Sequence, residues 1–565
     1  MKDVALKVFR KGEQAFFRVL GHMLSSNTLM LDQCPATLAP MRQRVLCEAS
    51  ILKEHELFAD VVLRWKCLFK EFHSQLIRQN SGEVFSAFFQ WHMICETSHK
   101  AASDEGATQA ALLGQMQREE ALLQTSAKSI LTDLSGTSYK DLQKRLVDGM
   151  LIVDYIFFAP LRENPLLDAY CVIVEKAGSP IVCELNYKAI RNQAAVVAQH
   201  LVSQSTSTTQ EKINSELSLL ARVLFPRELL DILASGKITK LYISPDSDIA
   251  HIPFDSLPVD LSGSGAEISL FEKFSVSILS STRKLLSSSV ETGSDIKPAK
   301  ERMCTIIGNP NFDFYKPVSA ESSSSIGKLI NFICGYFSIS LDQSGPIVEK
   351  LEHSKDEIDF ITSHLQSCGL AIQSMTGDDA TLRKVLSLES PLLIHVSSHA
   401  HGTTGRSVQA YRGSFFDDLK SATVVLAGFN TFSRKKFDQL PSDCGPALLS
   451  PLAIFSMNLK GTKLVFLSTC SSGAGKAPIQ EAVDSLAEAF LTAGAETVIA
   501  ALWPIADESA ADISKIFYEK MTAPGTLPSD ALTHAKKTMM EHDFTSYWSN
   551  CAVFACYGID KPLFV

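Results

Sequence analysis

The chain has 565 residues, 45% of them hydrophobic and 20% charged, and a formal net charge of −9 at pH 7. This composition is typical of a soluble globular protein with a large core, and roughly 150 residues per domain allow two to four domains. The acidic balance, without a basic run interleaved with aromatic residues, argues against a nucleic-acid-binding surface. No apolar run reaches the ~18 residues of a membrane span, and the N-terminus lacks a secretory signal, so we expect a cytoplasmic protein.

The 13 cysteines are irregularly spaced and contain no C-x-x-C pair. An odd number of cysteines without metal-ligand spacing indicates a reducing compartment with mostly free, buried thiols. The sequence therefore predicts neither a metal site nor a cofactor.

Residues 1–148 have a helical pattern. In ASILKEHELFADVVLRWKCLFKEFHSQLI, apolar residues recur three and four positions apart, which is typical of an amphipathic helix. Short polar stretches at 80–83 and 102–108 indicate turns between helices. We predict a helical array similar to tetratricopeptide repeats (TPR), although no clean 34-residue period is present.

Strand and helix patterns alternate after residue 148. The segment 168–185 predicts two strands around a Gly-Ser-Pro turn, and the segment 240–258 predicts a strand followed by a rigid, proline-marked stretch. Four continuous apolar runs end in small or polar residues, which is typical of parallel strands buried on both faces; they are RMCTIIGNPNF, SPLLIHVSSHA, TKLVFLSTC and AETVIAALWPI. Helical patterns between these runs indicate an α/β sheet with flanking helices.

Two of the predicted strands end at residue types that can perform catalysis, His399 and Cys470. The carboxyl ends of parallel strands meet at one edge of a sheet, so neighbouring strands would bring the imidazole and the thiol together. An adjacent imidazole can take the thiol proton and create a nucleophile. A buried structural thiol and a hydrogen-bonded histidine would leave the same pattern. His395, inside the apolar run, is interpreted as a hydrogen-bonded core residue.

The segments LLIHVSSHAHG, VFLSTCSSGAG, EAVDSLAEAFLTAGAETVIAALWPIADESA and SYWSNCAVFACYG resemble, in order and spacing, the CHAT domain, a member of the caspase–separase clan of cysteine peptidases. CHAT domains are often joined to helical repeats. The resemblance implies a caspase-like α/β sheet with flanking helices. It further implies a regulatory helical region over 1–148, an inactive pseudo-caspase half over 149–330 and a catalytic half over 331–565.

The resemblance also implies a cysteine endopeptidase with His399 as general base and Cys470 as nucleophile. Backbone N–H groups of Cys470 and Ala400 would stabilise the oxyanion. Asp507 would bind the arginine before the scissile bond, as an acidic residue does in separases, although Asp is also a favoured helix N-cap. Such proteins act in defence or cell death, some of them on gasdermin-like pore-forming proteins. The expected partners are a protein substrate and an activator that engages residues 1–148.

The sequence departs from the family pattern at two places. A glycine usually follows the catalytic histidine, whereas here Ala400 is followed by His401 and Gly402. Residues two apart on a strand point the same way, so His401 is an alternative base. Ser471 and Ser472 replace the usual Glu-Thr after the cysteine. These departures leave two alternatives open: a pseudo-peptidase that acts as an interaction scaffold, and an adaptor that acts through residues 1–148.

Overall fold

The computed structural model describes residues 9, 11, 13, 44–66, 137–158, 168–203, 210–287, 302–315, 347–402, 422–470, 479–542 and 552–564, apart from short gaps at 48, 247–248, 251, 435–439, 442, 446 and 503–504. Most of the region predicted to be a helical array lies outside these residues. Its main described element is helix α3 (His55–Trp65), in which eight of the 11 residues are buried, on more than one face of the helix. The helical expectation is therefore met where the N-terminal region is described.

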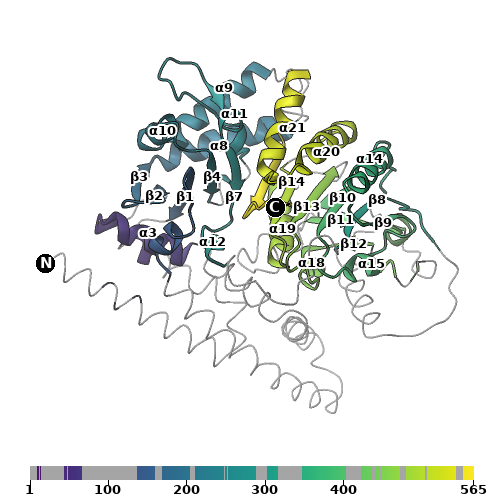
Figure 1. Ribbon diagram of the computed structural model, residues 1–565. Coiled ribbons are helices and arrows are strands. Elements are labelled where there is room, and N and C mark those ends of the chain that lie inside the picture. Colours follow the sequence, from purple (N-terminus) through teal and green to yellow (C-terminus); the bar gives the residue numbers. More distant parts are fainter. Residues whose placement is uncertain are drawn as a thin grey trace, which may run out of the picture.

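One mixed sheet of 13 strands forms the centre of the described part of the chain (Figure 1). Its order from one edge is β12, β11, β10, β13, β14, β15, β7, β4, β1, β2 and β3, while β8 pairs with β10 and with β9. The strands are β1 (Met150–Phe158), β2 (Asp168–Glu175), β3 (Ile181–Leu185), β4 (Lys240–Ser244), β7 (Ser275–Ile278), β8 (Cys304–Pro310), β9 (Ile372–Gly377), β10 (Leu393–Gly402), β11 (Ala422–Val425), β12 (Leu448–Leu449), β13 (Leu464–Cys470), β14 (Thr497–Ala501) and β15 (Phe554–Gly558). A separate two-stranded ribbon contains β5 (Pro258–Val259) and β6 (Ile268–Ser269).

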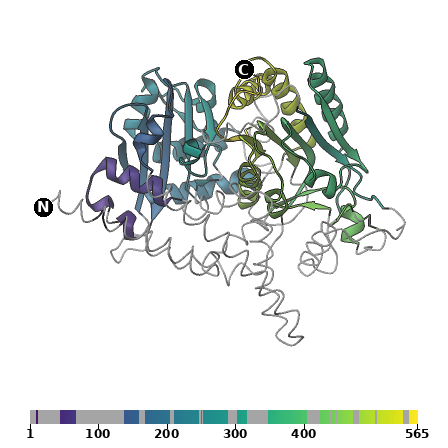
Figure 2. The same ribbon diagram turned by 60° about the horizontal axis from the view of Figure 1, so that its bottom comes forward.

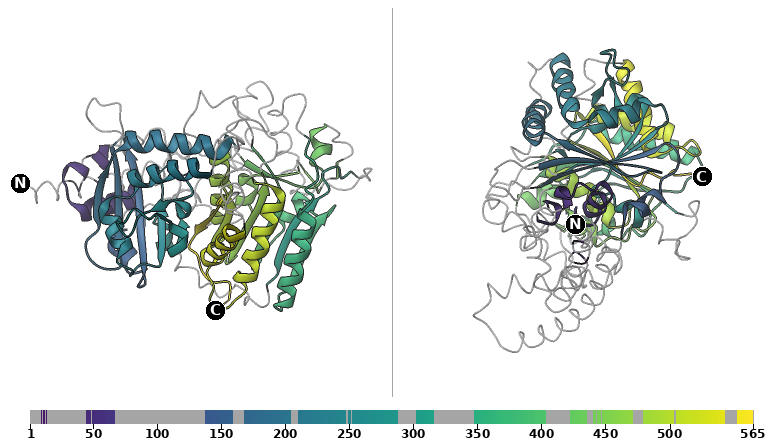
Figure 3. Two further views of the ribbon diagram at one scale, coloured as in Figure 1. Left: turned by 90° about the horizontal axis from the view of Figure 1, so that it is seen from above. Right: turned by 90° about the vertical axis from the view of Figure 1, so that its left-hand side faces the viewer.

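Helices cover both faces of this sheet, which Figure 3 shows in its right-hand view. They are α7 (Tyr139–Gln143), α8 (Tyr187–Ser203), α9 (Gln210–Leu224), α10 (Arg227–Ala234), α11 (Leu270–Lys273), α12 (Lys284–Ser287), α14 (Ser354–Ser367), α15 (Leu382–Leu386), α17 (Phe429–Ser433), α18 (Pro451–Phe455), α19 (Ile479–Thr492), α20 (Asp507–Met521) and α21 (Pro528–His542), with a 3₁₀ turn, η2 (Phe254–Ser256). The predicted fold class, an α/β sheet with flanking helices, is confirmed. Among the described helices, none combines the length and the apolar character needed to cross a bilayer.

The strands form two groups that lie beside each other, coloured blue and green to yellow in Figure 2. The first group contains β1–β4 and β7, the second contains β8–β15, and a parallel bridge between Tyr557 and Ile278 joins them. Strand β8 pairs with β9 and β10, so it belongs to the second group by its hydrogen bonds. The division of the chain at residue 330 stays a prediction, and the pairing of β8 favours a boundary before Cys304.

Buried ion pairs connect the two groups. Lys240 of β4 contacts Asp560 after β15, and both residues are buried. Lys284 of α12 donates to both carboxylate oxygens of Glu488 on α19, at 2.5 and 2.6 Å. A buried charge without its partner is strongly destabilising, so these pairs favour one relative placement of the two groups over others.

Helix α3 is fixed to the first group by two buried cations. Lys66, directly after the helix, contacts Asp154 Oδ1 of β1 at 2.5 Å and donates to the backbone oxygen of Ser244 at 2.9 Å. The guanidinium of Arg283 donates to the backbone oxygens of Leu63 and Arg64, which lie in the last turn of α3. A cation at a helix C-terminus satisfies carbonyls that have no partner within the helix. Helix α3 is therefore anchored to the first group of strands through its last turn.

Replacing Lys66 by Met tests this anchor. The side-chain volume stays similar, but the carboxylate of Asp154 loses its cation in a buried site, and we expect a loss of stability of about 3 kcal/mol. Urea denaturation followed by fluorescence measures it. The control is Lys176→Met, because the pair of Lys176 with Asp148 is exposed and contributes less than about 1 kcal/mol. Equal midpoints for the two variants would contradict a buried anchor at Lys66.

Candidate active site

Strands β10 and β13 are parallel neighbours at the centre of the second group. Their register pairs residues 393–399 with 464–470 one for one, and His399 stands opposite Cys470 in the last pair. Cys470 is the final residue of β13. The condition that the sequence analysis set for a Cys/His site, that the two strands are neighbours, is met. The Cys470 side chain lies outside the described residues, as do Ser471 and Ser472, so the register concerns the backbone of Cys470.

The His399 imidazole is buried and has two described contacts. Its Nε2 is 2.7 Å from the backbone oxygen of Glu349, and its ring lies 5.4 Å from that of Phe312. A carbonyl oxygen only accepts hydrogen bonds, so Nε2 carries the proton in the neutral ring and Nδ1 carries the lone pair. The Glu349 carbonyl therefore fixes both the tautomer and the orientation of the ring. Sequence reasoning missed Glu349, because a backbone carbonyl leaves no side-chain signature.

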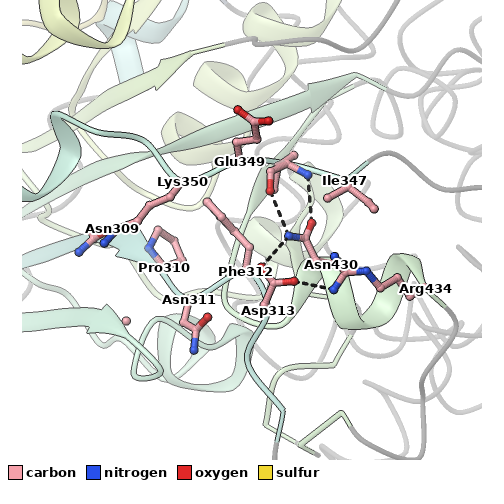
Figure 4. Close-up of a pocket in the computed structure, with 12 residues that line it drawn as sticks. Asn309, Pro310, Asn311, Phe312, Asp313, Ile347, Glu349, Lys350, Asn430 and Arg434 are labelled. Atoms are coloured by element: carbon pink, nitrogen blue, oxygen red, sulfur yellow. Dashed lines mark hydrogen bonds and ion pairs between the residues drawn. The ribbon is translucent and has the colours of Figure 1, made fainter.

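A pocket of about 460 Å³ lies against the two segments that contact this histidine (Figure 4). Phe312 and Glu349, the two residues in contact with the His399 ring, are part of its lining. The wall also contains Asp313, Asn430 and Arg434. A volume in this range is typical of ligand pockets in proteins. His399 is not one of the lining residues, and it meets the pocket wall through its contacts with Phe312 and Glu349.

His395 is a structural residue, as the sequence analysis interpreted it. It is fully buried, its Nδ1 is 3.3 Å from the Tyr518 hydroxyl, and its ring packs on Phe466. Its Nε2 lies 3.2 Å from Glu357 Oε1, outside hydrogen-bonding geometry, so this contact is electrostatic. Glu357 also accepts a hydrogen bond from Ser397 at 2.7 Å. The face of β10 that contains His395 and Ser397 is thereby fixed against α14 and α20.

Ala400 and His401 lie one and two residues beyond His399, where β10 pairs with a different strand. Their register partners are Val424 and Thr423 of β11. The side chain of His401 lies outside the described residues. That the backbone N–H groups of Ala400 and Cys470 stabilise an oxyanion stays a prediction.

Asp507 is the first residue of α20, and the N-cap position belongs to Ala506. The alternative interpretation of Asp507 as the N-cap of this helix is therefore wrong by one residue. Its Oδ2 instead accepts a hydrogen bond from the backbone N–H of His353, at 2.7 Å, just before α14. The role of Asp507 in substrate binding stays a prediction.

Burial argues against a second nucleophile among most of the other cysteines whose side chains are described. Six of the seven whose side chains are described are buried, and Cys368 is exposed. Burial raises the pKa of the Cys304 and Cys444 thiols to about 12, and it also raises the pKa of the Cys171 thiol well above its usual value. A thiol with a raised pKa holds its proton at neutral pH and is a poor nucleophile.

Comparison with known families identifies the chain. The profile of the CHAT domain matches residues 214–559, more than half of the chain. The chain belongs to the CHAT domain family. The family match agrees with the resemblance on which the sequence analysis relied.

Two curated relatives of this CHAT protein are named Tetratricopeptide repeat protein 28. The protein from Homo sapiens is 24% identical over 343 residues, which are 58% of this chain and 12% of the relative. The protein from Mus musculus is 33% identical over 125 residues, 22% of this chain and 5% of the relative. This chain spans about an eighth or less of their length.

Two solved structures are similar at 10% sequence identity. The separase–securin complex of Saccharomyces cerevisiae has a TM-score of 0.49, with 92% of this chain and 36% of that chain covered. The Arg-specific cysteine proteinase gingipain R has a TM-score of 0.33, with 67% of this chain and 75% of that chain covered.

Proposed function

We propose that this CHAT domain protein is a cysteine endopeptidase in which Cys470 is the nucleophile and His399 the general base. The observation that carries the proposal is the register of β10 with β13, in which the two residues form the last pair of neighbouring parallel strands. Neighbouring strands are ~4.8 Å apart, a distance that an imidazole and a thiol can bridge. Reactive residues of open α/β sheets gather at this end of the strands.

The orientation of His399 assigns a role to each ring nitrogen. Nε2–H donates to the Glu349 carbonyl, so Nδ1 accepts the proton of the Cys470 thiol. The thiolate attacks the peptide carbonyl, and the backbone N–H groups of Cys470 and Ala400 stabilise the oxyanion that forms. His399 then gives its proton to the leaving amine. Water, deprotonated by the same nitrogen, hydrolyses the thioester and restores the thiol.

The register supports His399 over His401 as the base. His401 lies two residues beyond the last pair that β10 forms with β13, and its backbone pairs with Thr423 of β11. On the opposite edge of β10, strand β8 ends its pairing at Ser397. His399 is thus the β10 residue that stands beside Cys470.

Co-expression with candidate substrates tests the dyad; gasdermin-like pore-forming proteins are the first class to try, together with candidate activators. We expect the wild type and His401→Ala to cleave, Cys470→Ala to be inactive, and His399→Ala to lose roughly 10²–10⁴-fold in rate. Immunoblots of substrate fragments measure the outcome.

Each contrary result has a distinct meaning. Cleavage by Cys470→Ala would exclude the peptidase assignment. If cleavage is lost in His401→Ala and retained in His399→Ala, the general base is His401. A wild type that binds partners but cleaves none would favour the alternative, a pseudo-peptidase scaffold.

We further propose that Asp507 selects a basic residue before the scissile bond. A carboxylate has about four acceptor sites, so the hydrogen bond from His353 leaves capacity for a guanidinium or ammonium group. A charge-assisted contact to arginine is strong and geometrically specific.

Substrate profiling with peptide libraries tests this selectivity. We expect Asp507→Ala to lower kcat/KM for cleavage after arginine by roughly a hundredfold, because a charge-assisted pair is lost. The matched control is Asp512→Ala, which removes another acidic residue of α20 whose side chain is about half exposed. Cleavage by the wild type after non-basic residues would contradict the proposed pocket.

Activation through the helical region is the regulatory part of the proposal. Arg283 binds the last turn of α3, and the next residue, Lys284, binds Glu488 of α19, the helix that follows Cys470 in the chain. A partner that shifts α3 would change the contacts of Arg283 and Lys284 and thereby the position of α19. We expect such a sensor in a cytoplasmic defence or cell-death pathway.

A further inference from the structure

The side-chain amide of Asn430 holds the backbone of Val348, the residue before Glu349. The N–H of Val348 donates to Asn430 Oδ1 at 3.0 Å, and Asn430 Nδ2 donates to the oxygen of Val348 at 3.0 Å. One amide plane thus satisfies both backbone groups of one residue, as a neighbouring strand would. Figure 4 shows the pair of dashed contacts between Asn430 and the segment that contains Ile347 and Glu349.

The amide itself is fixed in place. Asn430 is 1% exposed, and its Nδ2 also donates to Asp313 Oδ2 at 3.2 Å. Arg434, one turn further along the chain, pairs with the other oxygen of Asp313 at 2.6 Å. The orientation of the amide is therefore set by groups on two sides.

Asn430 also connects to the second neighbour of the histidine. Its backbone N–H donates to the oxygen of Phe312 at 2.8 Å, and the Phe312 ring packs on His399. One residue of α17 therefore holds the segments that supply both described contacts of the imidazole: the Glu349 carbonyl on Nε2 and the Phe312 ring on its face.

The segment 347–353, which contains Val348 and Glu349, is also attached at its C-terminal end, where α14 begins. The N–H of His353 donates to Asp507, and the Ser354 hydroxyl donates to the oxygen of Ser397 on β10 at 3.2 Å. The Glu349 carbonyl lies between the attachment at Val348 and the attachment at the start of α14. Without Asn430, the segment would keep its attachment at α14 and lose the one at Val348.

We propose that Asn430 is a positioning residue for the His399 base, acting through the backbone of Val348 and Glu349; this rests on the function proposed for the same site. An aspartate at 430 keeps the volume and the acceptor but replaces the donor to the Val348 oxygen by a second oxygen. An alanine removes both hydrogen bonds. In either variant the Glu349 carbonyl is no longer held against Nε2, and the imidazole loses its fixed tautomer and direction.

The test measures the rate of Cys470 alkylation by iodoacetamide in the full chain between pH 5.5 and 9, with site-resolved mass spectrometry. Alkylation needs the thiolate, which an oriented imidazole favours at neutral pH. We expect Asn430→Ala and Asn430→Asp to react about tenfold more slowly than the wild type at pH 7, with the midpoint of the pH profile moved upward. His399→Ala gives the limit of this shift.

The matched control is Asn311→Ala. Asn311 lines the same pocket, but its side chain donates to Asp378 and has no described contact with the segment of Glu349, so the pH profile stays that of the wild type. The buried thiols of Cys171 and Cys304 report folding in the same spectra, because they are labelled when the chain unfolds.

The outcomes separate the two proposals. If Cys470 alkylation is slow in His399→Ala but both Asn430 variants have the pH profile of the wild type, the positioning role of Asn430 is overturned and the proposed dyad is retained. A His399→Ala profile identical to the wild type would overturn the dyad itself. Labelling of Cys171 and Cys304 in both Asn430 variants would show that Asn430 serves folding, and it would overturn the positioning role.

Discussion

The in-register pairing of β10 with β13 is the constraint on which the candidate site depends. Side chains alternate along a strand, so a slip of one residue would turn the whole of β13 to the opposite face and separate the last pair. Apolar residues before that pair bury both faces of β10: Leu393, Ile394 and Val396 are at most 1% exposed. The residues that pair with them in β13 are equally buried: Leu464, Val465 and Leu467. The observed register of these two buried strands thus determines which residues meet at their ends.

Buried polar contacts between β10 and α14 also position the elements around the site. His395 and Ser397 of β10 both contact Glu357, so α14 is held at a defined height on the sheet. The segment before α14 then brings the Glu349 carbonyl to His399. Hydrogen bonds between buried polar groups favour one arrangement of the elements around them. In this protein the network that orders α14 also orients the proposed base.

Much of the fold could be predicted from the sequence, because it rests on periodicity. The hairpin of β2 and β3 and the parallel strands β8, β10, β13 and β14 follow from apolar runs that end in small or polar residues. The pairing of His399 with Cys470 followed once those strands were taken as neighbours. The helix start at Asp507 was predicted one residue too late, with Asp507 as the N-cap in place of Ala506, since a local pattern does not fix a helix start that closely.

The contacts of Glu349 and Asn430 could not be predicted. One is made by a backbone carbonyl, and the other joins α17 to a segment more than 80 positions earlier in the chain; neither has a periodic signature. The anchoring of α3 by Lys66 and Arg283 escaped for the same reason. Charged residues are normally exposed, and only the tertiary structure shows that these two are buried beside an acidic residue or helix carbonyls.

The most direct test of the central claim is covalent trapping with a peptidyl chloromethyl ketone that carries arginine at the reactive end, followed by peptide mapping. The ketone reacts with a thiolate held beside a protonated imidazole. The account predicts one adduct, on Cys470, that disappears in the His399→Ala variant. An adduct rate at Cys470 no higher than at the exposed Cys368 would contradict it.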